Sequence, residues 1–139
     1  PLRSKIDQDV LWQALNEGVI DTIGSDHAPH QLNEKEQPLC KCPSGVPGIE
    51  TTLPLLITAW RENKLSLAKL VALTHDNPQQ IFDLPVNDDL VLVDIVNYRE
   101  LSDAQMASKC HWTPFVGMNL TGFPRYVFTQ QRLIDCRKL

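Results

Sequence analysis

The sequence has no apolar run long enough to cross a bilayer, no excess of basic residues and no secretory signal at its start. Its longest apolar stretches, 53–60 and 90–96, are far shorter than the roughly 20 residues of a membrane-spanning helix. Its net charge of -4 lacks the basic footprint that phosphate binding requires. We therefore expect no membrane and no nucleic acid among its partners, and we expect a globular protein of the cytoplasm.

Metal-binding patterns are also scarce in this chain. Its four histidines include no His-x-His pair, and Cys40-Lys41-Cys42 is tighter than the usual zinc-ribbon spacing and has no second pair. Without a secretion signal, the four cysteines are expected to be free thiols, and we assign them no role.

Helical periodicity dominates the first part of the chain. Apolar residues recur at helical spacing over 5–16, and Gly18 is a natural stop for that helix. The β-rich run 19–25 predicts a buried strand, and the polar stretch 31–48, rich in Pro and Gly, predicts a long loop. Further helices are predicted to begin at three caps, namely Thr51 or Thr52, Ser66, and Asn77.

Strand patterns dominate after Leu84. The run 90–96 predicts a strand, and 126–128 with 132–134 predicts a terminal hairpin. Its turn, 129–132, has no glycine, so we expect a loose or irregular connection. We place a boundary near Pro85, which separates a helix-rich part, 1–84, from a strand-rich part, 85–139.

The most informative segment runs from Ser25 to His30, where an apolar run ends in Asp26, His27 and His30. Buried carboxylates and imidazoles must be paired or must bind metal to offset their desolvation. In (β/α) barrels, such groups at the carboxyl ends of strands are catalytic. A capped turn with exposed histidines would also explain the pattern, and from the residues alone both interpretations stay open.

Several motifs in a fixed order resemble the dihydroorotases of the cyclic amidohydrolase family. The resemblance covers nearly the whole chain and weakens after Pro124. It rests on the segments Pro1–Lys5, Asp26–His30, Glu34-Lys35, Pro43–Thr51, Leu53–Leu56, Asn77–Phe82 and Ser108–Phe115. It implies an α/β fold: the C-terminal part of a (β/α)8 TIM-type barrel of the metal-dependent amidohydrolase kind over 1–84, then strands of a small β-sandwich domain over 85–139.

The join between Leu84 and Asp89 is shorter than in many bacterial members. This feature resembles the dihydroorotase domain of the animal-type multifunctional pyrimidine-biosynthesis protein. The resemblance implies carbamoyl-phosphate synthetase and aspartate transcarbamoylase as partners and a homo-oligomeric full-length protein.

The resemblance also implies roles for four residues. Asp26 would bind Zn²⁺ and transfer a proton, while His30, Ser44 and Gly45 would contact the substrate. The reaction would be the reversible cyclisation of N-carbamoyl-L-aspartate to L-dihydroorotate, in pyrimidine (UMP) biosynthesis. A barrel takes about 250 residues, and the family's other metal ligands match nothing here, so we expect the isolated chain to be inactive.

Two other functions remain open. A hydantoinase or allantoinase would share the fold, but such relatives generally lack the second histidine of the motif, here His30. A catalytically inactive dihydroorotase-like scaffold is the third hypothesis, which Asp26 and His30 disfavour. His27 is interpreted as structural, and Trp12, Trp60 and Trp112 as packing residues.

Overall fold

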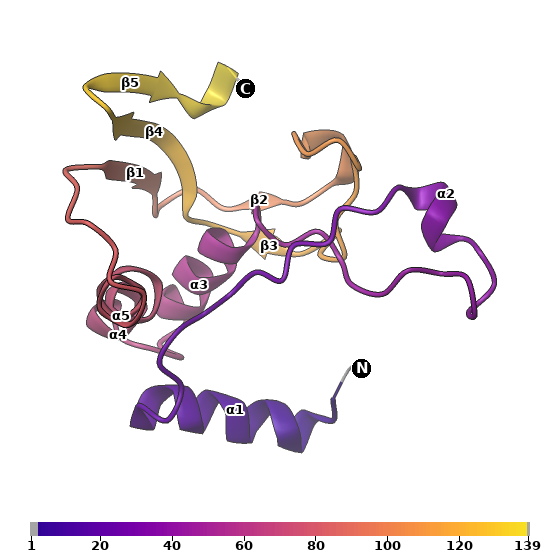
Figure 1. Cartoon of the computed structure of the whole chain (residues 1–139), viewed down its shortest axis with the longest axis horizontal. Coiled ribbons are helices and arrows are strands. Elements are labelled where there is room, and N and C mark those ends of the chain that lie inside the picture. The colour runs from indigo at the N-terminus through magenta and orange to yellow at the C-terminus, as the bar shows by residue number, and fades with distance from the viewer. Residues whose placement is uncertain (1–2, 139) are drawn as a thin grey trace. The chain divides into compact units, whose positions relative to one another are not determined.

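The computed structural model describes residues 3–138, without the side chain of residue 138, and it mixes helices with short strands (Figure 1). Contacts divide the chain into two compact units. The first comprises Pro1–Gly24 and Ala59–Asn87, and the second comprises Ser25–Thr58 and Asp88–Leu139. The predicted division of the sequence near Pro85 into a barrel part and a sandwich part stays a prediction.

Helix α1, Lys5–Glu17, opens the first unit and confirms the predicted first helix. Ser4 caps its start, since its hydroxyl accepts from the Asp7 amide while the Asp7 carboxylate accepts from the Ser4 amide. Gly18 ends it in a left-handed conformation with φ of 83°, which has no steric cost for glycine.

A nearly continuous helix follows in the same unit. It consists of α4, Leu67–Val71, a π-helical turn, η1, Ala72–Asp76, and α5, Asn77–Ile81. The hydroxyl of Ser66 accepts from the Lys69 amide, so this predicted cap is confirmed. The predicted cap at Asn77 is wrong: its backbone is helical, and its side chain instead donates to the Asp21 carbonyl at 2.8 Å.

The strand predicted over 19–25 is not present among the described residues. The backbone there is extended in places, but a strand needs a ladder to a neighbour. The segment has only an isolated bond of that kind, from the Ile23 amide to the Leu73 carbonyl at 3.2 Å.

A three-stranded antiparallel sheet lies in the second unit, in the order β1-β4-β5 (Figure 1). Its strands are β1, Leu90–Asp94, β4, Phe123–Thr129, and β5, Arg132–Asp135. This confirms the predicted strand and hairpin, but the expectation of a loose turn is wrong. Gln130 and Gln131 both adopt positive φ, 47° and 60°, which makes a tight two-residue turn without glycine.

The core of the second unit is centred on Leu101, Met106 and Leu120, against which Leu55, Phe115 and Phe123 pack. Helix α3, Thr52–Arg61, supplies Leu55 and lies in this unit up to Thr58. A two-stranded sheet of β2, Arg99–Glu100, and β3, Asn119–Leu120, flanks the core. Short helices α2, Leu32–Lys35, η2, Asp103–Gln105, and η3, Cys136–Lys138, complete the unit.

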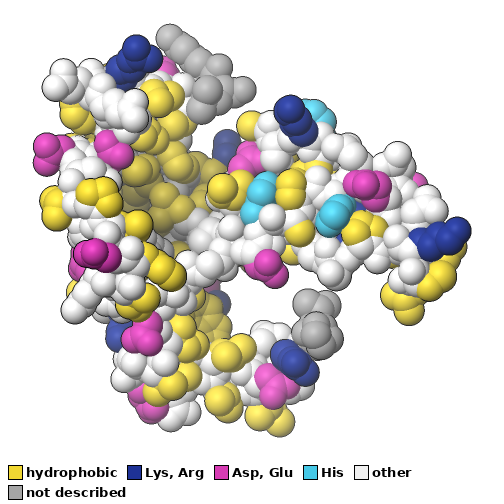
Figure 2. Space-filling view, viewed as in Figure 1, with side chains coloured by type: hydrophobic (Ala, Val, Ile, Leu, Met, Phe, Trp, Pro, Cys, Tyr) yellow, Lys and Arg dark blue, Asp and Glu magenta, His cyan; other side chains and the backbone are white. Residues whose placement is uncertain are grey.

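Hydrophobic side chains reach the surface in many places between charged ones (Figure 2). Among residues 3–138, no helix is both long and apolar enough to span a bilayer.

Candidate functional site

The segment from Ser25 to Glu50 holds its shape chiefly through side chains that bond to backbone. The Ala28 amide donates to the Val46 carbonyl at 3.0 Å, and His27 forms an isolated parallel bridge with Val46. The Nδ1 atom of His27 accepts from the amides of Gly48 and Ile49, at 3.1 and 3.3 Å. Because Nδ1 is the acceptor, the imidazole proton of this tautomer is on Nε2. These bonds close the base of the long loop and agree with a structural role for His27.

Asp26 precedes this loop in the sequence and has an unusual backbone conformation. Its φ is 44°, in the left-handed region that few residues other than Gly, Asn and Asp occupy. Its side chain is exposed, and its carboxylate makes no hydrogen bond or ion pair with any residue in the described part of the chain. The predicted catalytic group is therefore a free carboxylate, available to a ligand.

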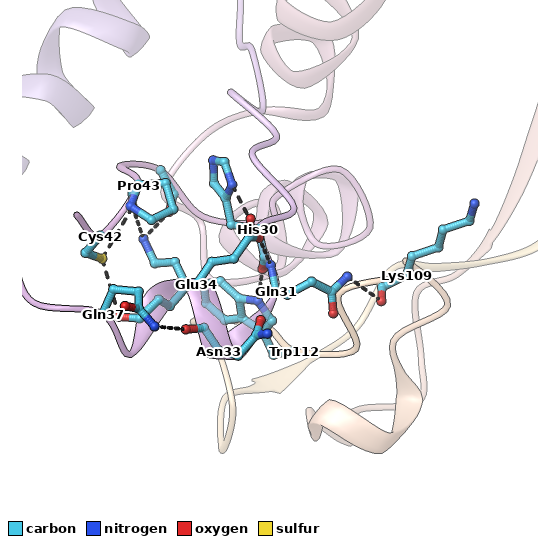
Figure 3. A network of polar contacts seen from close by, with 11 residues as sticks. His30, Gln31, Asn33, Glu34, Gln37, Cys42, Pro43, Lys109 and Trp112 are labelled. Carbon is cyan, nitrogen blue, oxygen red and sulfur yellow. Dashed lines mark hydrogen bonds and ion pairs between the residues drawn. The ribbon is translucent and has the colours of Figure 1, made fainter.

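His30 lies just before helix α2, in the polar network of Figure 3. The Nδ1 atom of its half-buried ring lies 3.8 Å from the Glu34 carboxylate, so the two groups attract when the imidazole is protonated. Its carbonyl accepts from the indole Nε1 of Trp112 at 2.7 Å. The position of the His30 backbone is thus fixed by an aromatic residue 82 positions away.

Ser44 and Gly45 lie against the same segment. Gly45 has φ of 87°, and a β-carbon at this position would come within 2.6 Å of the Ala28 Cβ. Lys35, half-buried at the end of α2, donates through Nζ to the carbonyls of Pro43, at 2.7 Å, and Gly45, at 3.0 Å. The structure therefore brings the Ser44–Gly45 pair beside the Asp26–His30 segment, with Ala28 as the point of contact.

The segment 107–112 is hydrogen-bonded to three residues of the segment 25–50. The Glu50 carboxylate accepts from the amides of Ala107, at 2.9 Å, and Ser108, at 2.8 Å. The Gln31 side chain donates to the Lys109 carbonyl at 3.1 Å, and the Trp112 indole donates to the His30 carbonyl (Figure 3).

The pKa of the Glu50 carboxyl lies below its ordinary value. Burial alone would raise this pKa, but the hydrogen bonds from Ala107 and Ser108 lower it by more. Glu50 is therefore ionised at neutral pH.

Two cavities of the second unit are lined in part by Glu50. A cavity of about 10 Å³, lined by His27, Glu50 and Trp112 among others, has room for about one water molecule. A groove of about 790 Å³ runs between Glu50, Met106 and the sheet. Neither is lined by Asp26, His30, Ser44 or Gly45.

No three His, Cys, Asp or Glu side chains of residues 3–138 lie close enough together to hold a metal ion. A carboxylate oxygen is a common zinc ligand. Asp26 is of the right type and is uncommitted, so this chain fits zinc as the source of a single ligand.

Lys35, Glu50 and the donor role of Trp112 were not found from the sequence. All three lie inside the motifs that carry the resemblance, at Glu34-Lys35, Pro43–Thr51 and Ser108–Phe115. Their function as backbone anchors depends on contacts across the loop, which spacing does not encode.

No family model matches the chain, but individual proteins do. The dihydroorotase of Methanosarcina mazei is 39% identical over an alignment of 144 positions, and the match covers 96% of this chain and 31% of that protein. The multifunctional protein CAD of Squalus acanthias is 40% identical over 127 residues, which cover 91% of this chain and 6% of that protein. The chain spans about a third of the length of the dihydroorotases that it matches.

Solved structures agree with this relationship. The dihydropyrimidinase of Brevibacillus agri matches with a TM-score of 0.91 and 31% identity, over 97% of this chain and 32% of that one. An inactive dihydroorotase-like domain of a CAD-like multifunctional protein from Chaetomium thermophilum matches with a TM-score of 0.71 and 29% identity, over 95% of this chain and 36% of that one.

The fold and its neighbours define the class, which is that of the cyclic amide hydrolases. Within this class, the curated relatives narrow the assignment further. Dihydroorotases are similar to this chain over 84% to 96% of its length.

Proposed function

We propose that the complete protein is a dihydroorotase, which reversibly cyclises N-carbamoyl-L-aspartate to L-dihydroorotate in pyrimidine (UMP) biosynthesis in the cytoplasm. The observation that carries the proposal is the match of 39% identity to a dihydroorotase across 96% of the chain. The exposed and unpaired carboxylate of Asp26, beside His30 and the Ser44–Gly45 loop, supports it.

Zn²⁺ is the cofactor that we propose, and this chain would supply one ligand, Asp26, to a site completed by other residues. Bound zinc lowers the pKa of a water molecule to about 7 and so provides a nucleophile at neutral pH. The surrounding barrel, over 1–84, and the β-sandwich strands, over 85–139, are part of the same proposal.

Asp26 handles the proton in this scheme. In the hydrolytic direction, the water oxygen bonds to the ring carbonyl carbon, and the carbon–nitrogen bond of the ring breaks. The Asp26 carboxylate accepts the proton that the attacking water loses and donates it to the departing nitrogen. In the direction of cyclisation, the same carboxyl group removes a proton from the ureido nitrogen and returns it to the leaving water.

The other site residues hold the substrate. The His30 imidazole can donate a hydrogen bond to the substrate carboxylate, and its Nδ1 lies 3.8 Å from the Glu34 carboxylate. Ser44 and Gly45 would offer backbone groups, and a residue without a side chain permits close approach at Gly45.

The relatives include both separate enzymes and a multifunctional chain at nearly the same identity, 39% and 40%. The percentage of sequence identity therefore does not favour a separate enzyme over a multifunctional chain. The short join between Leu84 and Asp89 supports the multifunctional one, with carbamoyl-phosphate synthetase and aspartate transcarbamoylase as partners in a homo-oligomer.

A hydantoinase is the second candidate, because solved hydantoinases and dihydropyrimidinases have TM-scores of 0.89 to 0.91 with this chain. The test is to assay the complete protein with carbamoyl-aspartate, dihydroorotate, hydantoin and dihydrouracil, with metal content measured in parallel. We expect turnover of the first two and bound zinc. Preference for hydantoin or dihydrouracil would establish the second candidate. A folded protein with no turnover of any would support the inactive scaffold.

A further inference from the structure

Lys35 is the one lysine of the long loop, 31–48, whose ammonium group is committed to backbone oxygens. Its Nζ lies 2.7 Å from the Pro43 carbonyl and 3.0 Å from the Gly45 carbonyl. Lys5 and Lys64, by contrast, pair with carboxylates. Among the described residues, no carboxylate lies within ion-pair distance of Lys35, so its positive charge acts on the two carbonyls that flank Ser44.

The direction of the Pro43 carbonyl determines the direction of the Ser44 amide. A trans peptide unit is planar, and its C=O and N–H bonds point in opposite directions. The described part of the chain has no cis peptide bond. Because the Pro43 carbonyl points at Lys35, the Ser44 N–H of the same peptide unit points away from the ammonium group.

The Ser44 amide has no acceptor among residues 3–138, and Ser44 is exposed. The neighbouring peptide is restrained as well, because the Gly45 carbonyl also meets Lys35 and the Gly45 α-carbon packs on Ala28. A cation on the carbonyl oxygen polarises the peptide unit and strengthens its N–H as a donor.

We propose that Lys35 is a positioning residue that turns the Ser44 N–H toward the ligand, where this amide donates to a carboxylate or carbonyl oxygen of dihydroorotate and carbamoyl-aspartate. The inference rests on the proposed function, and it assigns a role to a side chain that does not itself touch the substrate. A lysine that only tied the loop together would not require an unpaired amide on the opposite side of the peptide.

The test uses the complete protein with three substitutions. Lys35→Met removes the charge and both hydrogen bonds, and Lys35→Arg keeps a cationic donor. Lys41→Met is the matched control, because Lys41 is exposed in the same loop and its side chain makes no hydrogen bond or ion pair with the described residues. The melting temperature measures the stability of the fold, and kcat measures the rate of the reaction. KM and the calorimetric Kd for dihydroorotate measure whether the Ser44 amide still contributes to substrate binding.

We expect Lys35→Met to raise KM and Kd by about tenfold, the effect of one hydrogen bond, with kcat and melting temperature nearly unchanged. Lys35→Arg should recover most of the affinity, and Lys41→Met should match the wild type. Unchanged KM and Kd in Lys35→Met, or an equal increase in Lys41→Met, would overturn the inference alone. If the folded wild-type protein neither binds nor turns over dihydroorotate, the proposed function fails together with it.

Discussion

The site segment, 25–50, and the sheet β1-β4-β5 hold their backbones in different ways. The sheet is built from backbone ladders, with Leu90 to Asp94 paired to β4 across a register shift between Leu92 and Val93, and with β4 paired to β5. The site segment has an isolated β-bridge, the short helix α2 and local turns, and His27, Lys35 and Glu50 each bind two further backbone groups. Single side chains thus control the geometry of the site, whereas in the sheet many equivalent backbone hydrogen bonds each contribute a small part of the stability. Substitutions should therefore affect mainly function in the first region and mainly stability in the second.

The largest effect on stability is expected at Gly122, next to the sheet. A β-carbon there would lie 2.3 to 2.7 Å from three side-chain atoms of the buried residue Ile57, and φ is 84°. Overpacking and the left-handed backbone together predict that Gly122→Ala lowers the free energy of unfolding by about 3 kcal/mol. Denaturant titration of the complete protein measures this loss. Gly117→Ala is the control, because Gly117 has nearly the same φ, 82°, but open space around it, so about 1 kcal/mol is expected. Equal losses at the two positions would show that crowding against Ile57 is unimportant.

A smaller loss of stability with a larger loss of function is expected at Gly45. Here an added β-carbon meets the Ala28 Cβ at 2.6 Å, and φ is 87°. Gly45→Ala should cost about 2 kcal/mol and should displace the Ser44–Gly45 backbone from the Asp26–His30 segment. Steady-state kinetics should show a KM at least about tenfold higher, since a misplaced contact weakens binding. The comparison between the regions breaks down if Gly45→Ala loses stability but binds substrate normally.

The smallest effect is expected at Glu50, and it depends on pH. The folded pKa of Glu50 is depressed, so its ionised form stabilises the protein above the unfolded pKa, and this contribution disappears as the pH falls through the folded pKa. Glu50→Gln should therefore cost about 1 kcal/mol at pH 7 and progressively less below about pH 4. Denaturant titrations of the wild type and of Glu50→Gln, at pH 7 and below about pH 4, measure this difference in the free energy of unfolding. Glu36→Gln, at an exposed position of the same site segment, should show no loss. A cost for Glu50→Gln that is the same at both pH values would contradict the role of the charge.

Elements with local signals were predictable from the sequence. The helix over 5–17, its stop at Gly18, the cap at Ser66 and the strands over 90–94 and 123–135 follow from periodicity and capping chemistry. Asn77 misled the prediction because the helix runs on through a π-turn, which frees its side chain to bind Asp21. The turn at Gln130 and Gln131 was misjudged because two strands in register can hold non-glycine residues at positive φ.

The site was predictable only in part. Asp26, His30, Ser44 and Gly45 were predicted as site residues because they lie in the motifs that resemble dihydroorotases. In the structure, Ala28 brings the segment 26–30 into contact with the segment 44–46. The roles of Lys35, Glu50 and Trp112 depend on contacts between distant residues, such as Trp112 with His30, and no periodicity records these. Their catalytic and binding roles stay predictions.

The central claim is that the Asp26 carboxylate performs proton transfer in a dihydroorotase, and Asp26→Asn tests it most directly. Asparagine tolerates the left-handed backbone at φ of 44° but cannot accept the proton. Asp83→Asn is the control, since Asp83 is also exposed and has φ of 49°. In the complete protein, Asp26→Asn should lower kcat for carbamoyl-aspartate cyclisation by about 10²- to 10⁴-fold at an unchanged melting temperature, while Asp83→Asn keeps wild-type turnover. Wild-type turnover in Asp26→Asn would contradict the account.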